Sequence, residues 1–358
     1  MRLVIIFILT VTLTCLGLIN LYSIHQGYSN QFYRQIFTFC LGVLILILIR
    51  FIKMKHLMWL APFAYIAGLI TLILIPLGMG KEAFGATRWI SLGGFQFQPS
   101  EFAKIFLILT LASLLTKKGN PLLKYFYSIL TLGIYGVLVY WQPDLGTSLV
   151  LGVVFISMVY LSDLPVKYLV VLSVIILLVM PFGWFMLKDY QKSRLLVFIN
   201  PDIDPGGLGY NLKQALIAVG SGGLTGKGFM QGTQAKFGFL PVPWSDFAFA
   251  SLMEEGGLIL GLLIILSYII ILGVTLSLVS RSVTPQGVLL IAGVLGMWGF
   301  EILINIGMNM GIAPVVGIPL PFISYGGSAM IKNYLALGLL IKACSKRENR
   351  GLWFTSKM

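Results

Sequence analysis

Long apolar runs separated by short polar segments dominate this chain. Residues 3–22 and 57–80 contain no charged residue, and each run is long enough for a helix that crosses a bilayer core about 30 Å thick. The pattern predicts an all-α polytopic membrane protein with about ten transmembrane helices, forming a single integral membrane domain over residues 1–358. The other runs, with boundaries good to a few residues, lie at 35–52, 100–116, 124–142, 145–162, 167–187, 247–280, 285–308 and 323–344.

Composition supports a membrane protein. Only 10% of the residues are charged and 58% are hydrophobic, whereas soluble domains carry about 25% charged residues. Too few charges remain to cover a water-facing surface, which excludes a soluble protein. The first apolar run is longer than the core of a signal peptide and no small-residue cleavage site follows it, so we expect it to be retained as a helix.

Lys and Arg residues are concentrated in every second connection between these runs. If both termini lie in the cytoplasm, the inner segments hold fourteen Lys and Arg residues and the short outer loops hold three. Since cytoplasmic loops carry an excess of Lys and Arg, this asymmetry predicts that orientation. The inner residues are Arg2, Arg50, Lys53, Lys55, Lys117, Lys118, Lys124, Lys167, Arg281, Lys342, Lys346, Arg347, Arg350 and Lys357, and the outer ones are Arg34, Lys81 and Arg88.

The net charge of +13 is therefore mainly an insertion signal, with attraction to anionic inner-leaflet lipid as a second use. Nucleic-acid binding is disfavoured, because the basic residues form no single solvated face. The three cysteines lie in or beside apolar runs and indicate neither disulfides nor a metal knuckle. His25 and His56 are expected on opposite sides of the membrane, which excludes a zinc site or a Ser-His-Asp triad.

Three outer segments contain turn-forming residues. Residues 188–246 form a glycine-rich basic loop, far longer than usual connections, whose apolar pattern from 212 to 219 predicts an ordered loop with helical pieces on the membrane surface. In 79–100, the Gly93–Gly94 turn predicts an interfacial hairpin. In 309–328, three prolines forbid a regular helix, so we expect a rigid outer loop or re-entrant segment.

Ionisable residues at membrane depth are costly, so each needs a partner or a function. Glu101 and Lys104 are three residues apart and share a helix face. They form either a pair that merely tolerates burial or an ion pair lining a polar cavity, with Lys104 available to an anionic ligand. Glu301 and Lys332 are expected to neutralise each other between the last two helices.

Two aspartates lie at the outer ends of helices. Asp144 follows Gln142-Pro143 and is placed to cap the sixth run. Asp246 follows two prolines at the start of the eighth run, where it or Ser245 would be an N-cap. An ionised carboxylate there, beside the basic loop, also suits a general base for a substrate hydroxyl, and the residues alone leave capping and catalysis equally open.

The run GSGGLTGKG at 220–228 superficially resembles a phosphate-binding loop. Its spacing fails, because Ser221 stands where the first glycine belongs and Gly228 replaces the Ser/Thr. A nucleotide is therefore not expected, and a lipid-linked phosphate held by backbone amides and Lys227 remains an alternative.

Five segments together resemble the SEDS (shape, elongation, division and sporulation) family of bacterial cell-wall proteins. The resemblance covers nearly the whole chain and favours the elongation members (RodA) over the division members (FtsW). The matching segments are GATRWISLGGFQFQPSEFAKI at 85–105, QPDLGTS at 142–148, GSGGLTGKGFMQGTQ at 220–234, FLPVPWSDFAFASLMEEGG at 239–257 and NIGMNMGIAPVVGIPLPFISYGGS at 305–328.

The resemblance implies a peptidoglycan glycosyltransferase of the bacterial cytoplasmic membrane that polymerises lipid II on its outer face. It makes Asp246 the general base for the acceptor hydroxyl, and it places Glu101 and Lys104 in a central cavity. Family members commonly have His-Thr before this aspartate and Glu after FLP, whereas here Trp244-Ser245 and Val242 stand there. The other residues expected to bind or support the substrate are Arg88, Asp144, Arg194, Lys227 and Ser324.

A lipid II flippase is the main alternative, because transporters also use paired intramembrane charges and broken glycine-rich segments. A scaffold role is compatible with either activity. The resemblance further implies a class B penicillin-binding protein and other cell-elongation proteins as partners. No cofactor is firmly implied, and a divalent cation, Mg²⁺ or Mn²⁺, is left open because no dedicated cage of ligands is visible in the sequence.

Overall fold

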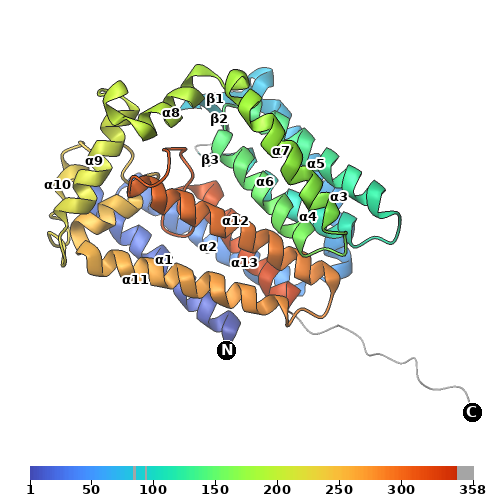
Figure 1. Ribbon diagram of the computed structural model, residues 1–358. Helices are drawn as coiled ribbons and strands as arrows, with labels where there is room; N and C mark the ends of the chain where they lie inside the picture. The colour runs from blue at the N-terminus through green and yellow to red at the C-terminus, as the bar shows by residue number, and fades with distance from the viewer. Residues whose placement is uncertain (84–85, 93–94, 345–358) are drawn as a thin grey trace, which may run out of the picture.

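The computed structural model describes residues 1–83, 86–92 and 95–344, and helices dominate them (Figure 1). The elements in chain order are α1 (Arg2–Ile24), α2 (Asn30–Phe51), α3 (Met54–Leu74), the π-helix η1 (Ile75–Met79), β1 (Gly80–Ala83), β2 (Ala86–Leu92), β3 (Phe95–Phe97), α4 (Pro99–Leu115), α5 (Pro121–Trp141), α6 (Leu145–Tyr160), α7 (Lys167–Met186), α8 (Asp189–Ile199), the 3₁₀-helix η2 (Pro201–Ile203), α9 (Leu208–Ser221), α10 (Thr233–Lys236), α11 (Ala248–Val279), α12 (Pro285–Asn309) and α13 (Gly327–Ala343).

Each predicted apolar run coincides with one of the helices α1–α7 and α11–α13. Among the described residues, six helices are long and apolar enough to cross a membrane, namely α1, α2, α3 with η1, α5, α11 and α12. The helices α4 and α13 have 17 residues each and carry buried charges. The chain is thus a multi-helix membrane protein, as its hydropathy pattern predicts.

Helix boundaries follow local chemistry. Pro121 and Pro285 occupy the first turns of α5 and α12, where the missing proline amide costs no hydrogen bond. The side chains of Ser29, Asn120 and Thr284 accept amides as N-caps of α2, α5 and α12. Each of these three helices therefore starts where a capping residue follows a polar connection.

The helices pack around a shared apolar core, in which α13 lies against α2, and α12 against α6 and α11. Trp298, Phe322 and Tyr334 are fully buried there, with ring centroids 5.3 and 5.5 Å apart in edge-to-face pairs. Large apolar side chains such as Phe51 and Trp59 are exposed on the outside of the bundle. Such a surface fits lipid as its surroundings.

Residues 188–246 form an ordered, largely helical segment. Figure 1 shows α8, α9 and α10 together on the side of the bundle away from the C-terminus. The predicted apolar pattern of 212–219 lies in α9, but its Leu212 and Ala215 pack against Phe247 and Met308. This helix therefore buries one face against protein, and only its other face, with Ile217 exposed, is free to meet a membrane surface.

The predicted hairpin exists as a three-stranded antiparallel sheet, the one departure from an all-α fold among the described residues. Its order is β1-β2-β3, with Lys81 opposite Trp89 and Ile90 opposite Phe97. The expected Gly93–Gly94 turn lies outside the described residues, as do Lys346, Arg347, Arg350 and Lys357.

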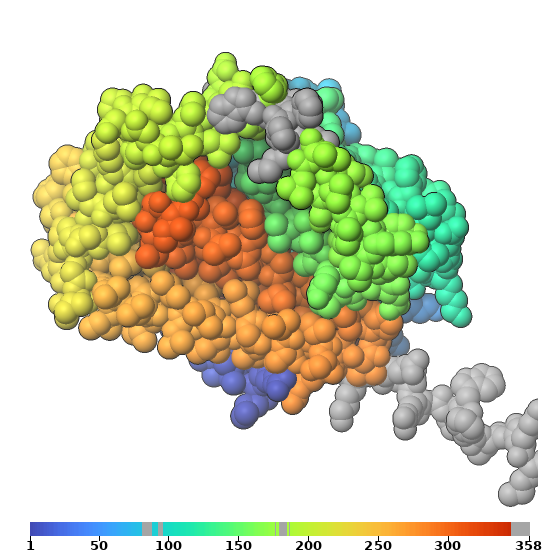
Figure 2. Space-filling model, in the orientation of Figure 1, coloured from blue at the N-terminus to red at the C-terminus, as the bar shows by residue number. Residues whose placement is uncertain are grey.

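Residues 310–326 contain no helix, as the prolines predict. The molecular surface is hollowed between the α8–α9 segment and α7, with the C-terminal part of the chain at the floor (Figure 2).

Candidate active site

A cavity of about 500 Å³ lies where the predicted outer segments meet. Its walls come from α2, the β2–α4 segment, the start of α6, helices α8 and α9, the turn before α11 and the residues that lead into α13. A second cavity, of about 300 Å³, is lined by residues from 115–116, 161–163 and 282–289. These residues belong to predicted inner segments. The large cavity is therefore lined by predicted outer segments and the small one by predicted inner segments, the same division that the Lys and Arg bias predicts.

The charged residues that line the large cavity are Arg34, Arg88, Glu101, Arg194 and Asp246. Four of these were singled out from the sequence as site residues, and Arg34 was recognised only as an outer-loop cation. Three guanidinium groups around one cavity make it suited to an anionic ligand.

Asp246 lies in the turn before α11 and does not cap that helix. The cap prediction is wrong, because α11 begins at Ala248 and its N-cap is the apolar Phe247. The amides of Ser245 and Phe247 bond instead to the Val242 carbonyl, at 3.1 and 3.5 Å. The Asp246 carboxylate is left to line the cavity, where its Oδ1 accepts a hydrogen bond from the Ser245 hydroxyl at 3.1 Å.

The turn is held in an unusual backbone conformation. Val242 has a φ of 44°, in the left-handed region that a β-branched residue rarely adopts. Gly317, in the 310–326 segment, packs against this turn. A methyl group added to Gly317 would lie 3.3 Å from Asp246 Oδ2. Strained backbone of this kind is concentrated at functional sites.

Two asparagines of α12 fix the main chain of Asp246. The Nδ2 atoms of Asn305 and Asn309 donate to its carbonyl oxygen at 3.2 and 3.0 Å, and both side chains are fully buried. Ser324 donates from Oγ to the Ser245 carbonyl at 2.6 Å, so it supports the turn from behind. Neither asparagine was expected at the site, although two amides four residues apart in an apolar helix share one face.

Burial raises the pKa of the Asp246 carboxyl above its ordinary value of 3.8, and the charge of Asp144 acts in the same direction. The Ser245 hydrogen bond and the cations Arg194 and Arg88 oppose this rise. Burial and the charge of Arg88 lower the pKa of the Arg194 guanidinium, whereas the charge of Asp246 raises it.

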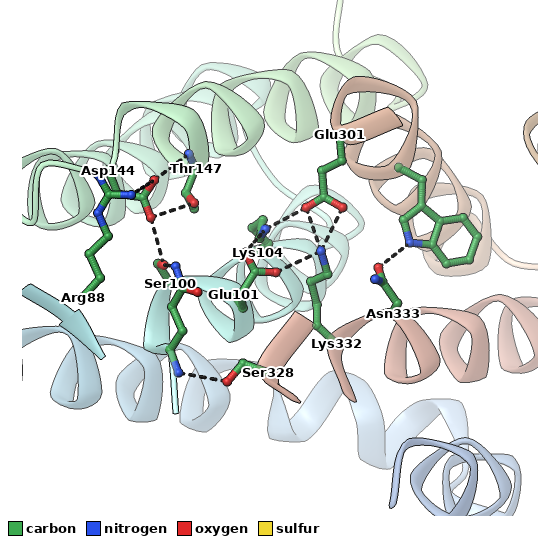
Figure 3. Close-up of polar contacts among 12 residues, drawn as sticks. Arg88, Ser100, Glu101, Lys104, Asp144, Thr147, Glu301, Ser328, Lys332 and Asn333 are labelled. Atoms are coloured by element: carbon green, nitrogen blue, oxygen red, sulfur yellow. Dashed lines mark hydrogen bonds and ion pairs between the residues drawn. The ribbon is translucent and has the colours of Figure 1, made fainter. Parts of the chain in front are cut away.

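Arg88 connects the cavity with Asp144 (Figure 3). Its guanidinium donates to the carbonyl oxygens of Gln142, at 3.2 Å, and Pro143, and its Nη1 lies 3.6 Å from Asp144 Oδ1. Asp144 caps α6 as predicted, because Oδ1 accepts from the Thr147 amide at 3.1 Å and Oδ2 from the Thr147 hydroxyl at 2.9 Å. Asp144 therefore both holds Arg88 and caps the N-terminus of α6.

The two predicted ion pairs are one buried network of four charges from α4, α12 and α13 (Figure 3). Lys104 Nζ lies 2.6 Å from Glu101 Oε1 and 2.7 Å from Glu301 Oε1. Lys332 Nζ lies 2.7 Å from Glu301 Oε1 and 3.0 Å from Glu101 Oε2. All four are buried, so Lys104 is not available to an anionic ligand as the functional alternative proposed, and Glu101 is the member that reaches the cavity wall.

The structure does not bring Lys227 to the cavity. Its Nζ lies 2.6 Å from Glu254 Oε1 and 2.8 Å from the Thr233 hydroxyl. The Glu254 carboxylate also accepts the amides of Thr233 and Gln234, at 2.8 and 3.1 Å. Lys227 therefore fastens the outer loop to α11.

Amides at the end of the 220–228 run are occupied, which argues against a phosphate loop. Those of Lys227 and Gly228 donate to the carbonyls of Glu254 and Glu255, each at 3.0 Å. The amide of Leu258 donates in return to the Gly223 carbonyl, at 2.9 Å. These bonds satisfy the groups that a break in α11 leaves free, so the motif has a structural use.

Known proteins resemble this chain over nearly its whole length. A family profile described as cell cycle protein, for FtsW, RodA and SpoVE, matches residues 1–349. Peptidoglycan glycosyltransferase MrdB of Escherichia coli strain K12 is 37% identical over 324 residues, covering 88% of this chain and 86% of the relative.

Two solved structures share the fold. A chain from a structure described as structural coordination of polymerization and crosslinking by a peptidoglycan synthase complex is 31% identical, with a TM-score of 0.80, covering 94% of this chain and 96% of the other. An aspartate-to-alanine variant of the rod shape determining protein RodA of Thermus thermophilus is 29% identical, with a TM-score of 0.69 and coverages of 94% and 95%.

Proposed function

Because the chain belongs to the FtsW, RodA and SpoVE family of cell cycle proteins, we propose that it polymerises lipid II, with Asp246 as general base. Relatives named peptidoglycan glycosyltransferases confirm the predicted class of enzyme and favour it over the flippase alternative. The observation that carries the catalytic assignment is the setting of Asp246. Of the two carboxylates that the described residues place on the cavity wall, Glu101 is ion-paired and Asp246 has no direct ion pair.

The reaction uses the cavity as follows. Asp246 takes the proton of an acceptor sugar hydroxyl, whose oxygen attacks the anomeric carbon of the donor. The glycosidic C–O bond forms as the bond to the lipid pyrophosphate breaks, and the pyrophosphate leaves with the bonding electrons. Arg194, Arg88 and Arg34 supply positive charge for that leaving group. A raised Asp246 pKa suits this role, since a base works best when its pKa approaches the operating pH.

The same proposal orients the protein. Ten membrane crossings in the bacterial cytoplasmic membrane, with both termini inside, place the arginine-lined cavity on the outer face. Two observations support this arrangement: the bias of Lys and Arg towards the inner segments, and the division of the two cavities between predicted outer and inner segments. Similarity to MrdB and RodA favours a role in cell elongation.

The proposed partner is a class B penicillin-binding protein, within a larger group of cell-elongation proteins. A similar chain occurs in a peptidoglycan synthase complex that couples polymerization with crosslinking. Crosslinking is a separate chemistry, so a polymerase of this kind needs a transpeptidase beside it.

The carboxylates nearest the cavity that the structure describes are mostly engaged with other side chains. Glu101 is committed to lysines and Asp144 to Arg88 and Thr147, so Asp246 is the one cavity carboxylate with uncommitted capacity among the described residues. Mg²⁺ or Mn²⁺ would then be held chiefly by the substrate pyrophosphate, and no catalytic step depends on it here.

The test is polymerisation of labelled lipid II by the purified chain in liposomes. We expect Asp246→Asn to lower the rate by about 10²–10⁴-fold, and Asp202→Asn, in an exposed loop pair with Lys213, to leave it unchanged. Transbilayer movement of lipid II without polymer, equal in wild type and Asp246→Asn, would replace the polymerase with the flippase.

A further inference from the structure

Trp244 lines the cavity two residues before Asp246, in the same turn. Its side chain is half-buried, so part of its large apolar surface stays accessible. Because Trp244 and Asp246 line the same cavity, a substrate bound at Asp246 would lie beside Trp244. The residue thus combines a flat apolar ring with immediate proximity to the proposed base.

Trp244 has contacts on its ring and along its main chain. Its ring stacks on the imidazole of His25, with centroids 5.6 Å apart and planes inclined by 28°. His25 is the C-cap of α1, and its Nε2 is buried without a hydrogen-bond partner among the described residues, so its ring acts as a packing surface. The Trp244 carbonyl accepts the Tyr325 amide at 2.8 Å, and Asn20 donates to the Pro243 carbonyl at 3.5 Å.

A sugar acceptor needs such a surface. Its hydroxyl must lie within about 2.6–3.2 Å of the Asp246 carboxylate to transfer a proton, and net positive charge by itself does not fix the orientation of a neutral ring. A pyranose has an apolar face of C–H groups that packs on a flat aromatic side chain, while its hydroxyls point to polar neighbours. The arginines and Trp244 therefore suit the two different parts of the reaction, the anionic leaving group and the neutral acceptor.

We propose that Trp244, backed by His25, is the stacking platform that binds the acceptor sugar, an N-acetylated hexose ring, and presents its hydroxyl to Asp246. The proposal rests on the function proposed above and identifies its acceptor subsite. Trp244 acts by binding the acceptor ring and takes no proton. The competing explanation is that Trp244 only packs α1 against the turn before α11.

Binding of a soluble acceptor, a β-1,4-linked N-acetylglucosamine oligosaccharide, tests the platform without catalysis. Saturation-transfer NMR on the full-length protein in detergent would measure its Kd in an Asp246→Asn background. We expect Trp244→Leu to weaken binding roughly three- to tenfold, the range of an aromatic contact. Trp244→Phe keeps a flat ring and should remain within about twofold. Trp59→Ala, an exposed tryptophan on the bundle exterior, is the matched control.

Leucine retains apolar volume without a flat face, so the Leu and Phe variants separate stacking from packing. Equal loss of binding in both variants, or no loss in either, overturns the platform, as does a wild-type protein that does not bind the oligosaccharide. In polymerisation assays the Leu variant should raise KM for lipid II more than it lowers kcat. Trp244-dependent sugar binding without any polymer would refute the polymerase and keep the sugar site. Polymer that depends on Asp246, with an unchanged KM in Trp244→Leu, would refute the sugar platform and keep the polymerase.

Discussion

The main-chain carbonyl of Asp246 accepts hydrogen bonds from two buried side-chain amides, and these bonds position the residue whose carboxylate lines the cavity. Asn305 and Asn309 bind that carbonyl oxygen, and Asn309 also accepts the Ala250 amide at 3.0 Å through its Oδ1. The two side chains therefore join the turn, the first turn of α11 and the outer half of α12. A base that must meet a hydroxyl within a few tenths of an ångström depends on such anchoring.

Replacing Asn309 with Ala should lower kcat about 10²-fold with a smaller change in KM, because a shift of about 1 Å in the base misaligns proton transfer. Steady-state polymerisation kinetics measure both constants. Ser267→Ala, on the exposed side of α11, should leave both constants unchanged. A rise in KM at constant kcat would show that Asn309 binds substrate instead of positioning Asp246.

The pH dependence of kcat/KM should report Asp246. Because this base must be deprotonated, activity rises with pH and levels off above its pKa, which burial places above 3.8. Arg194 lowers that pKa, so Arg194→Gln should move the rising limb to higher pH, besides reducing the rate. Arg281→Gln, at an inner connection, is the control. A limb that stays in place, or moves to lower pH, contradicts the assignment of Asp246 as the titrating base.

At the scale of elements, α11 is interrupted at Gly257, and the outer loop repairs the interruption. Gly257 has a φ of 68°, which only glycine adopts without strain. The loop residues 223–228 supply partners for the carbonyls and amides that the break exposes. The glycine-rich motif and the helix break are therefore one structural unit.

An alanine at 257 should destabilise the protein by about 2–5 kcal/mol. Its methyl group would lie 2.3 Å from the Gly226 amide nitrogen and 2.5 Å from the Leu224 carbonyl oxygen, and neither backbone can withdraw. Gly273→Ala in the same helix is the matched control, because its added methyl group meets no described atom within 4 Å beyond the adjacent backbone of its own helix. Helix propensity should make that variant neutral or slightly stabilised. Thermal unfolding in detergent compares the Gly257→Ala and Gly273→Ala proteins. Equal melting temperatures would contradict the conclusion that the loop packs tightly against the break in α11.

At the scale of the whole molecule, the four-charge network joins α4, α12 and α13 across the centre of the bundle. Removing one member leaves a buried charge uncompensated, so Lys332→Met should cost about 3–5 kcal/mol. The double variant Lys332→Met with Glu301→Gln restores neutrality around the Glu101–Lys104 pair and should recover part of that loss. Thermal unfolding of both proteins measures this. A double variant less stable than the single one would show that charge balance does not govern the site.

The proposed topology can be read from the accessibility of single cysteines. In a chain whose Cys15, Cys40 and Cys344 are replaced by serine or alanine, Lys213→Cys in α9 should react from outside with a membrane-impermeant maleimide. Lys118→Cys, at an inner connection, should react only after the membrane is opened. Labelling of both positions in intact cells would disprove the orientation.

Much of the fold could be predicted from the sequence, because a segment that crosses lipid must be apolar and must satisfy its backbone hydrogen bonds within a helix. The apolar runs coincide with helices, residues 310–326 with their prolines contain no helix, and Asp144 caps α6. The site was predicted less completely. Asp246, Arg88, Arg194 and Glu101 meet at one cavity, whereas Lys227 is used elsewhere and the roles of Asn305, Asn309 and Trp244 had no clear local signal.

The sequence by itself determined which segments are helices, since hydropathy is a local property that water and lipid act on directly. The side on which the helix ends lie stays a prediction from the Lys and Arg bias. Only the tertiary structure decided which charges meet. Whether Lys104 faces a ligand or Glu301, and whether Asp246 caps a helix or lines a cavity, depends on contacts between residues about 200 positions apart or on a backbone turn. A buried charge is placed by the partners that compensate it, and those partners come together only when the helices pack.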